Sequence, residues 1–270
     1  MHRGSFYIAS GLKRTLSLGE KPTMPFSPIE GNLEVNSDIG IILPTYCEAA
    51  NIEKLVQEIE DLNLSVSILV IDDSSPDHTA NMVRKLQERY GNILLLLRPR
   101  KSGLGTAVTD GFKAFLSLER QPECIITMDA DFSHNPEEVP KLVEPIRDGY
   151  DLVIGSRYCQ GGGTKDWSLL RIAVSKIANL ITRVTIDAGV ADYTSGMRCY
   201  STRLVKDMIV DLHSQTYEIQ IETIRQAHTR KCRLREVPIT FVNRKKGKSK
   251  LTMTEIKDFL SYILSLSRRC

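Results

Sequence analysis

Two aspartates one residue apart are the strongest chemical signal in the sequence. Asp129 and Asp131 come directly after the apolar run 124–128, in the segment MDADFSHNP. Where a strand ends and its pleat stops, two such carboxylates can point at one cation. Carboxylate oxygens suit the hard ions Mg²⁺ and Mn²⁺, which in turn bridge to the phosphates of a substrate. The segment therefore predicts a divalent-metal site, with a solvated turn at the end of a strand as the alternative.

A second acidic pair, Asp72 and Asp73, ends another apolar run in the segment VIDDSSPDHT. A carboxylate at such a position can accept hydrogen bonds from a base or a ribose. Ser75 or Asp77 can equally cap the helix that is expected next, and the two roles are compatible. The pair is therefore a candidate nucleoside site.

Two further segments carry polar or glycine-rich strings. Tyr46 and Glu48, in PTYCE, offer a ring face and a hydrogen-bond acceptor after an apolar run, and a turn with a half-buried tyrosine is the alternative. Gly103 and Gly105 precede a helical pattern, and a helix N-terminus after glycine attracts anions. The segment lacks both the Walker A spacing and the full GxGxxG string, so neither a kinase-like nor a dinucleotide-binding site is indicated.

Strand and helix patterns alternate along the chain from Asp38 onward. The expected strands are residues 39–46, 65–73, 92–98, 124–131 and 151–157, and the expected helices are residues 51–62, 79–90, 105–119 and 136–147. This alternation predicts an α/β fold in which a mostly parallel sheet carries helices on both faces. Since ligands bind beyond the carboxyl ends of such strands, the polar segments should converge on one edge of the sheet.

The composition argues against several other classes of protein. Among 270 residues, 36 basic and 33 acidic side chains leave a net charge of +3, too small an excess to indicate nucleic-acid binding. No apolar run approaches the roughly 18 residues of a membrane span, so we expect a soluble chain. The 6 cysteines include no CxxC pair, which favours reduced thiols in the cytosol over a zinc site or a disulfide framework.

Both ends of the chain differ from its middle. Residues 1–37 are rich in glycine and proline without a sustained period, which predicts a disordered extension. Residues 1–19 are basic, as in a transit peptide, and lack the apolar core of a secretory signal. We expect residues 38–250 to form a single catalytic domain. Residues 251–270 predict a C-terminal amphipathic helix that lies at a membrane interface or packs on the domain.

A set of motifs carries a resemblance to a known family. In order they are LPTYCE, VIDDSSPDHT, KSGLGTA, MDADFSH, GSRY, DYTSGMRCY and VPITFVNRKKGKSK. The chain resembles the GT-A fold glycosyltransferases of family 2 over residues 38–255, and most closely the dolichol-phosphate (polyprenol-phosphate) mannosyltransferases. The SPD string and the SGMRCY string favour this group over relatives that use UDP-glucose.

The resemblance implies a donor site and a metal. The implied nucleoside-binding residues are Pro44, Tyr46, Glu48, Ile71 and Asp73, those for Mg²⁺ or Mn²⁺ and the diphosphate are Asp129, Ala130 and Asp131, and those of a basic loop over the phosphates are Arg244 and Lys250. Some relatives carry glutamine where this chain has Ser133, so water rather than a third protein group is expected on the metal.

The resemblance also implies an acceptor site formed by Arg157, Arg171 and Ser175, with Arg157 counted among the catalytic residues alongside the two aspartates of the metal site. The segment 167–184 is amphipathic, with an apolar stripe against basic residues. It is either an ordinary helix facing the core or a helix at a bilayer surface that presents Arg171 and Ser175 to a lipid phosphate.

The expected reaction is the inverting transfer of mannose from GDP-mannose to dolichyl or polyprenyl phosphate. A phosphate monoester is already ionised at neutral pH, with a second pKa of about 6, so no general base is assigned. The alternatives are a polyprenyl-phosphate glucosyltransferase that uses UDP-glucose and a non-catalytic protein that binds nucleotide sugars. The expected location is peripheral, on the cytosolic face of the endoplasmic reticulum in a eukaryote or of the plasma membrane in a prokaryote, with small membrane-anchoring subunits as further partners.

Overall fold

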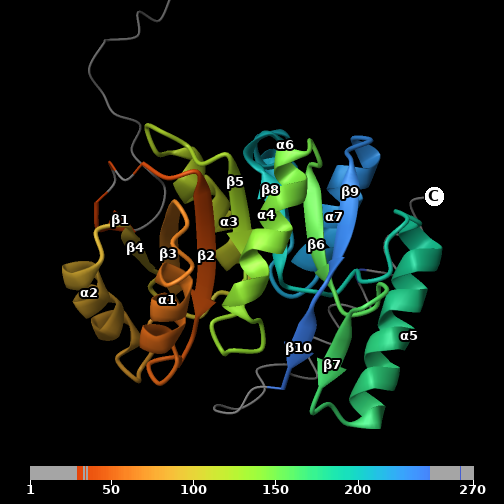
Figure 1. The fold of residues 1–270 in the computed structure, drawn as a ribbon, viewed down its shortest axis with the longest axis horizontal. Coiled ribbons are helices and arrows are strands. Elements are labelled where there is room, and N and C mark those ends of the chain that lie inside the picture. Colours follow the sequence, from red (N-terminus) through yellow and green to blue (C-terminus); the bar gives the residue numbers. More distant parts are fainter. Residues whose placement is uncertain (1–28, 33, 35, 244–261, 263–270) are drawn as a thin grey trace, which may run out of the picture.

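The computed structural model describes residues 29–32, 34, 36–243 and 262 (Figure 1). Its main sheet has eight strands. Their spatial order is β1 (Ile29–Glu30), β4 (Ile93–Leu97), β3 (Val66–Asp72), β2 (Ile39–Thr45), β5 (Cys124–Thr127), β8 (Arg198–Ser201), β6 (Leu152–Ser156) and β9 (Leu234–Pro238). Strand β1 is antiparallel to β4, and β8 is antiparallel to both of its neighbours, while the other pairs are parallel.

Helices cover both faces of this sheet (Figure 1). One layer consists of α1 (Ile52–Glu60), α2 (Thr79–Arg89) and α4 (Val139–Arg147), and the other of α3 (Leu104–Leu116), α6 (Thr202–Met208) and α7 (Ile219–Thr229). Two short 3₁₀ helices, Pro136–Glu138 and Ile209–Asp211, adjoin α4 and α6. Along β3, Ile68 and Val70 join the first core and Leu69 and Ile71 the second, as the alternation of a strand requires.

The predicted α/β class and the predicted elements between residues 39 and 157 are confirmed. One strand is shorter than expected, because β5 ends at Thr127 rather than at Asp131. The chain turns there: Asp129 N–H donates to His134 Nδ1 at 3.0 Å, and Phe132 has a left-handed φ of +61°. Strand β8, which was not predicted, begins in the motif SGMRCY, ends one residue after it and separates β5 from β6.

The predicted disordered extension 1–37 is wrong for its described end. Ile29 and Glu30 form β1 on β4, and the carboxylate of Glu30 accepts two hydrogen bonds of 2.8 Å from Arg84. Residues 1–28 lie outside the described residues. So does the predicted C-terminal helix 251–270, apart from Tyr262, which packs against Ile221.

A smaller unit lies beside the main sheet. It consists of the parallel pair β7 (Gly163–Lys165) and β10 (Thr240–Val242), with α5 (Leu169–Ile186) alongside (Figure 1). Helix α5 buries Asn179 and Thr182 and turns large apolar side chains outward. Among the described helices, none combines the length and apolar character that crossing a bilayer requires.

Candidate active site

A pocket opens at the carboxyl ends of β2, β3 and β5, and we call it the strand-end pocket. Every described residue that was predicted to bind the donor lines it. These residues are Pro44, Tyr46, Glu48, Ile71, Asp73, Asp129, Ala130 and Asp131. Arg244 and Lys250, the other two predicted donor residues, lie outside the described residues. The expected convergence of polar segments on one edge is therefore present for three strands.

The turn at residues 129–134 presents the two predicted metal ligands to this pocket. Asp131 is buried, and its Oδ1 accepts the Ser133 N–H at 3.0 Å. The side chain of Asp129 is 39% exposed. In the described part of the chain, no group of three acidic, histidine or cysteine side chains could hold a metal. Two carboxylates at an open pocket fit Mg²⁺ or Mn²⁺ that takes its other ligands from phosphate and water.

His134 completes this turn and was not among the predicted site residues. The side chain is fully buried, and burial lowers the pKa of His134 despite the nearby carboxylates of Asp129 and Asp131. Its Nδ1 accepts the Asp129 N–H, so the proton of the neutral ring is on Nε2. His134 is thus a fixed acceptor that shapes the turn at residues 129–134, which we call the metal turn.

The acidic pair at the end of β3 divides into two roles. Asp72 is fully buried and accepts hydrogen bonds from Thr45 and Ser75, so it holds the loop together. Asp73 faces the strand-end pocket and is paired with Arg98 Nε at 2.6 Å. Asp73 therefore also orders the start of α3, because Arg98 donates in turn to the Gly103 carbonyl at 3.2 Å.

The N-cap position of α2 is His78 rather than Ser75 or Asp77, but Asp77, one residue earlier, does bind the first backbone N–H of the helix. Its Oδ1 accepts the Thr79 N–H at 3.2 Å at the start of α2, and its Oδ2 accepts the Ala49 N–H at 3.0 Å. Asp77 therefore joins the loop after β3 to the loop after β2.

The strand-end pocket also contains residues that were not predicted. Lys101 lines it with Nζ 5.1 Å from the ring centroid of Tyr46, and Tyr217 enters from a distant loop. A Cβ on Gly103 or Gly105 would lie 2.3 or 2.4 Å from carbonyl oxygens of that loop. The KSGLGTA motif therefore allows the close approach that brings Tyr217 in, which the sequence signals only as glycines.

The predicted acceptor residues lie together beside α5. We call Arg157, Arg171 and Ser175, with the aromatic residues Tyr158 and Trp167, the arginine cluster. Tyr158 Oη donates to Ser175 Oγ at 2.7 Å. The guanidinium carbon of Arg171 lies 3.9 Å from the ring centroid of Trp167, and that of Arg157 lies 5.4 Å from it. One indole therefore contacts both cations.

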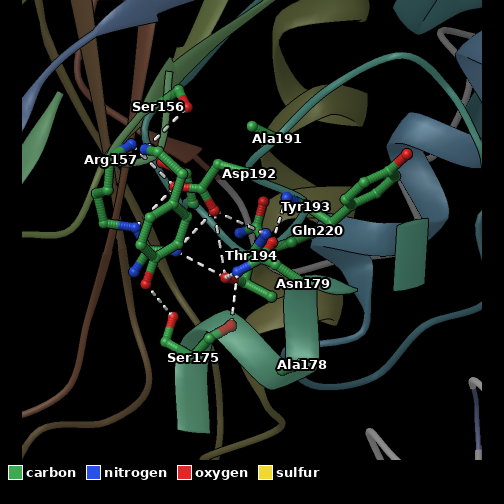
Figure 2. Close-up of polar contacts among 12 residues, drawn as sticks. Ser156, Arg157, Ser175, Ala178, Asn179, Ala191, Asp192, Tyr193, Thr194 and Gln220 are labelled. Carbon is green, nitrogen blue, oxygen red and sulfur yellow. Dashed lines mark hydrogen bonds and ion pairs between the residues drawn. The ribbon is translucent and has the colours of Figure 1, made fainter. Parts of the chain in front are cut away.

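Arg157 is held by a buried ion pair (Figure 2). Its Nε and Nη2 each donate to the carboxylate of Asp192 at 2.7 Å, and Nη2 also donates to Thr194 Oγ1 at 2.6 Å. Burial alone would lower the pKa of Arg157, but Asp192 raises it above its ordinary value. Asn179 on α5 donates to Thr194 Oγ1 and accepts the Tyr193 N–H, so α5 helps to hold this loop.

The apolar stripe of α5 faces away from both cores, so the core-facing alternative is wrong. Leu169 is 84% exposed, Leu170 75% and Val184 81%. Val174, Ile177 and Leu180 on the same helix are also more than half exposed. A hollow of about 540 Å³ separates α5 from the segment after β6, and Arg157, Lys176 and Arg183 are among the residues that line it.

A parallel-centred sheet with an Asp-x-Asp turn at its edge defines a glycosyltransferase of the GT-A type, and solved structures of that type share the fold. Glucosyl-3-phosphoglycerate synthase from Mycobacterium tuberculosis, solved with Mn²⁺ and uridine diphosphate, matches with a TM-score of 0.61 and 18% identity over 87% of this chain and 80% of that chain. TarS of S. aureus matches with a TM-score of 0.59 and 15% identity, over 85% and 66% of the two chains.

The chain belongs to the family described as Glycosyl transferase family 2, whose pattern matches residues 40–209. A polyprenol monophosphomannose synthase of Mycolicibacterium smegmatis is 35% identical over 220 residues, which are 81% of this chain and 82% of that protein. A dolichol-phosphate mannosyltransferase of Pyrococcus furiosus is 34% identical over 234 residues, 85% of this chain but 64% of that protein. This chain is therefore a glycosyltransferase.

Proposed function

We propose that this enzyme transfers mannose from GDP-mannose to dolichyl or polyprenyl phosphate, with inversion at the anomeric carbon. The observation that carries the proposal is the presence of two neighbouring sites of opposite charge, the carboxylates of the strand-end pocket and the guanidinium groups of the arginine cluster. The names of the two relatives support the acceptor and the sugar.

The strand-end pocket takes the donor. Tyr46 offers its ring to the base, and Glu48 and Asp73 offer acceptors to the nucleoside. Asp129 and Asp131 would hold Mg²⁺ or Mn²⁺, which when bound neutralises charge on the diphosphate. The Mn²⁺ in the Mycobacterium tuberculosis structure supports a divalent ion in this fold. Arg244 and Lys250 follow β10 in the sequence, and in this proposal they reach the same phosphates.

The arginine cluster takes the phosphate of the acceptor. Both Nη2 protons and the Nε proton of Arg157 are used on Asp192 and Thr194, and among the described residues this leaves Nη1 for a ligand. Arg171 and Ser175 add a second guanidinium and a hydroxyl. An acceptor phosphate oxygen forms a bond to the anomeric carbon while the bond from that carbon to GDP breaks on the opposite face. No base is needed, because the acceptor is already ionised, and positioning supplies the rate.

A bilayer is the surface that fits α5. Its exposed stripe is flanked by Lys176 and Arg183, two exposed side chains without an ion pair among the described residues. An apolar face bordered by cations suits the boundary between acyl chains and anionic headgroups. We therefore propose a peripheral enzyme on the cytosolic face of its membrane, with a small membrane-anchoring subunit as the alternative occupant of the stripe.

Product analysis tests the function. Purified enzyme with GDP-mannose, Mg²⁺ or Mn²⁺ and a short polyprenyl phosphate should yield polyprenyl phosphomannose and GDP. A thermal-shift titration with Mn²⁺ should favour GDP over UDP. Turnover with UDP-glucose in place of GDP-mannose would establish the glucosyltransferase alternative, and nucleotide binding without any turnover would establish the non-catalytic one.

A further inference from the structure

We propose that Phe241 on β10 is a positioning residue that couples the metal turn to the arginine cluster, with His134 as its contact on the metal side. The proposal rests on the proposed function for its meaning in transfer, but the coupling itself can be measured without turnover. Neither residue lines the strand-end pocket or the hollow beside α5, and no described residue lines both.

On the metal side, β10 touches the turn through backbone and side chain. The Val242 N–H donates to the Ser133 carbonyl at 3.1 Å. The ring of Phe241 meets the ring of His134 edge to face, with centroids 5.2 Å apart and planes at 87°. Gly196 is also close, since a Cβ there would lie 3.3 Å from His134 Cε1. His134 is therefore confined, and a shift of Phe241 moves the acceptor of the Asp129 N–H.

On the acceptor side, the same strand touches both arginines. Phe241 packs edge to face on Trp167, with centroids 5.2 Å apart. Its ring centroid also lies 5.7 Å from the guanidinium carbon of Arg157 and 5.8 Å from that of Arg171. Two residues further along, Asn243 Oδ1 accepts from Arg171 Nη1 at 2.9 Å. One aromatic ring thus contacts groups on both sides of the reaction.

Among the described residues, the backbone of β10 bonds to only a few neighbouring segments. Strand β10 pairs with β7 alone among the described strands, and it follows β9 directly through Ile239, whose N–H donates to the Ser156 carbonyl at 3.0 Å. Phe241 is nonetheless only 8% exposed, because His134 and Trp167 enclose it. The ring contacts of Phe241 therefore add to the backbone bonds that position β10, and they join this strand to both sites.

Coupling of this kind is reciprocal in binding free energy. In the proposed coupling, metal and nucleotide in the strand-end pocket hold the turn at His134 in one position. Strand β10 transmits that position to Trp167. A bound acceptor acts in the reverse direction. The function of the strand is to align the two sites, and misalignment of about 1 Å can reduce a transfer rate by up to about 100-fold.

Trp167 is the single tryptophan of the chain and reports on the coupling directly. Titration of the enzyme with Mg²⁺ and GDP should change Trp167 emission in step with binding measured by calorimetry. Phe241→Leu should remove the emission change while the calorimetric affinity for GDP stays within about threefold. Thr240→Ala, an exposed position on the same strand, is the matched control and should keep the response.

Substitutions of His134 provide the second measurement. Asn can place an amide oxygen near the position of Nδ1, so His134→Asn should keep most of kcat, whereas His134→Leu and Phe241→Leu should lower kcat by roughly tenfold or more with melting temperatures near that of His134→Asn. An unchanged Trp167 signal on saturation with GDP would overturn the coupling and leave the proposed function standing. A coupled signal without mannosyl transfer would sustain the coupling and refute the proposed function, and absence of nucleotide binding would refute both.

Discussion

The strand-end pocket and the arginine cluster are positioned by different parts of the molecule. The pocket sits on the ends of β2, β3 and β5, whose backbones are fixed by ladder hydrogen bonds between two buried cores. The cluster sits on α5 and on loops, and side-chain bonds such as those between Arg157 and Asp192 hold it. The pocket therefore depends on the sheet, whereas the cluster depends on a few polar pairs.

The largest expected effect is on the pocket side. Asp131→Ala should lower transfer by roughly 1000-fold, because it removes charge stabilisation of the leaving diphosphate. The melting temperature should change little, since the sheet positions the turn. Turnover and thermal unfolding of the purified variant test this. Near-normal turnover would remove Asp131 from the proposed metal site.

The second-largest effect concerns the stability of the two regions. Asp192→Asn should cost about 3–5 kcal/mol in the free energy of unfolding, because it leaves the buried Arg157 without its counter-charge. Asp73→Asn is the matched control, since it also removes a buried carboxylate from an arginine. Arg98 keeps a second carboxylate, Asp110 at 3.3 Å, so the control should lose less. Equal losses in urea unfolding would contradict the contrast between the two regions.

The same variant predicts a dependence on pH. Burial would raise the pKa of Asp192, but Arg157 lowers it below its ordinary value. A carboxyl whose folded pKa is depressed stabilises the protein above its unfolded pKa of about 3.9, and this contribution is lost as the pH falls through the folded value. The stability difference between the wild type and Asp192→Asn should therefore shrink below about pH 4. A constant difference from neutral to acid pH would contradict it.

A third substitution tests whether the donor site and the acceptor site are separate. Arg171→Ala should raise the KM for polyprenyl phosphate by roughly 10- to 100-fold, the value of a hydrogen bond to a charged group. Binding of GDP should stay nearly unchanged. Steady-state kinetics together with calorimetry test this, and equal losses for both ligands would show that the two sites are not separate.

The smallest effect concerns the surface of α5. Val184→Gln removes an exposed apolar side chain and should weaken binding to anionic vesicles by roughly tenfold, if about 1.4 kcal/mol of burial in lipid is lost. Val210 is 76% exposed on another part of the surface, so Val210→Gln is the control. Vesicle co-sedimentation and thermal unfolding should show weaker binding without lower stability. Equal weakening by both variants would argue against α5 as the contact surface.

The sequence was sufficient for the parts of the fold that rest on local patterns. Strands such as β2 and β3 are mostly apolar runs, and the polar strings after them had to meet at one edge. Strand β8 escaped prediction because its place depends on antiparallel pairing with strands far away in the chain. The same reason explains Tyr217, which reaches the pocket only through the close approach at Gly103.

The pairing of side chains was also beyond prediction. Asp192 was visible at the start of a motif, but 35 residues separate it from Arg157, and nothing local joins the two. The helical period showed that α5 is amphipathic, but it does not show which face of the helix packs on the protein. Only the packing of Asn179 and Thr182 shows which side of α5 meets the protein.

Strand β8 has a consequence for the size of what can be transferred. Neighbouring strands lie about 4.8 Å apart, so the inserted strand sets β6 roughly 10 Å from β5 along the sheet. In the proposed reaction, we expect a donor phosphate held beyond β5 and an acceptor phosphate held beyond β6 to leave room for a sugar ring between them. Without β8 the two negative charges would come closer together, so we expect this strand to limit transfer to a single sugar unit.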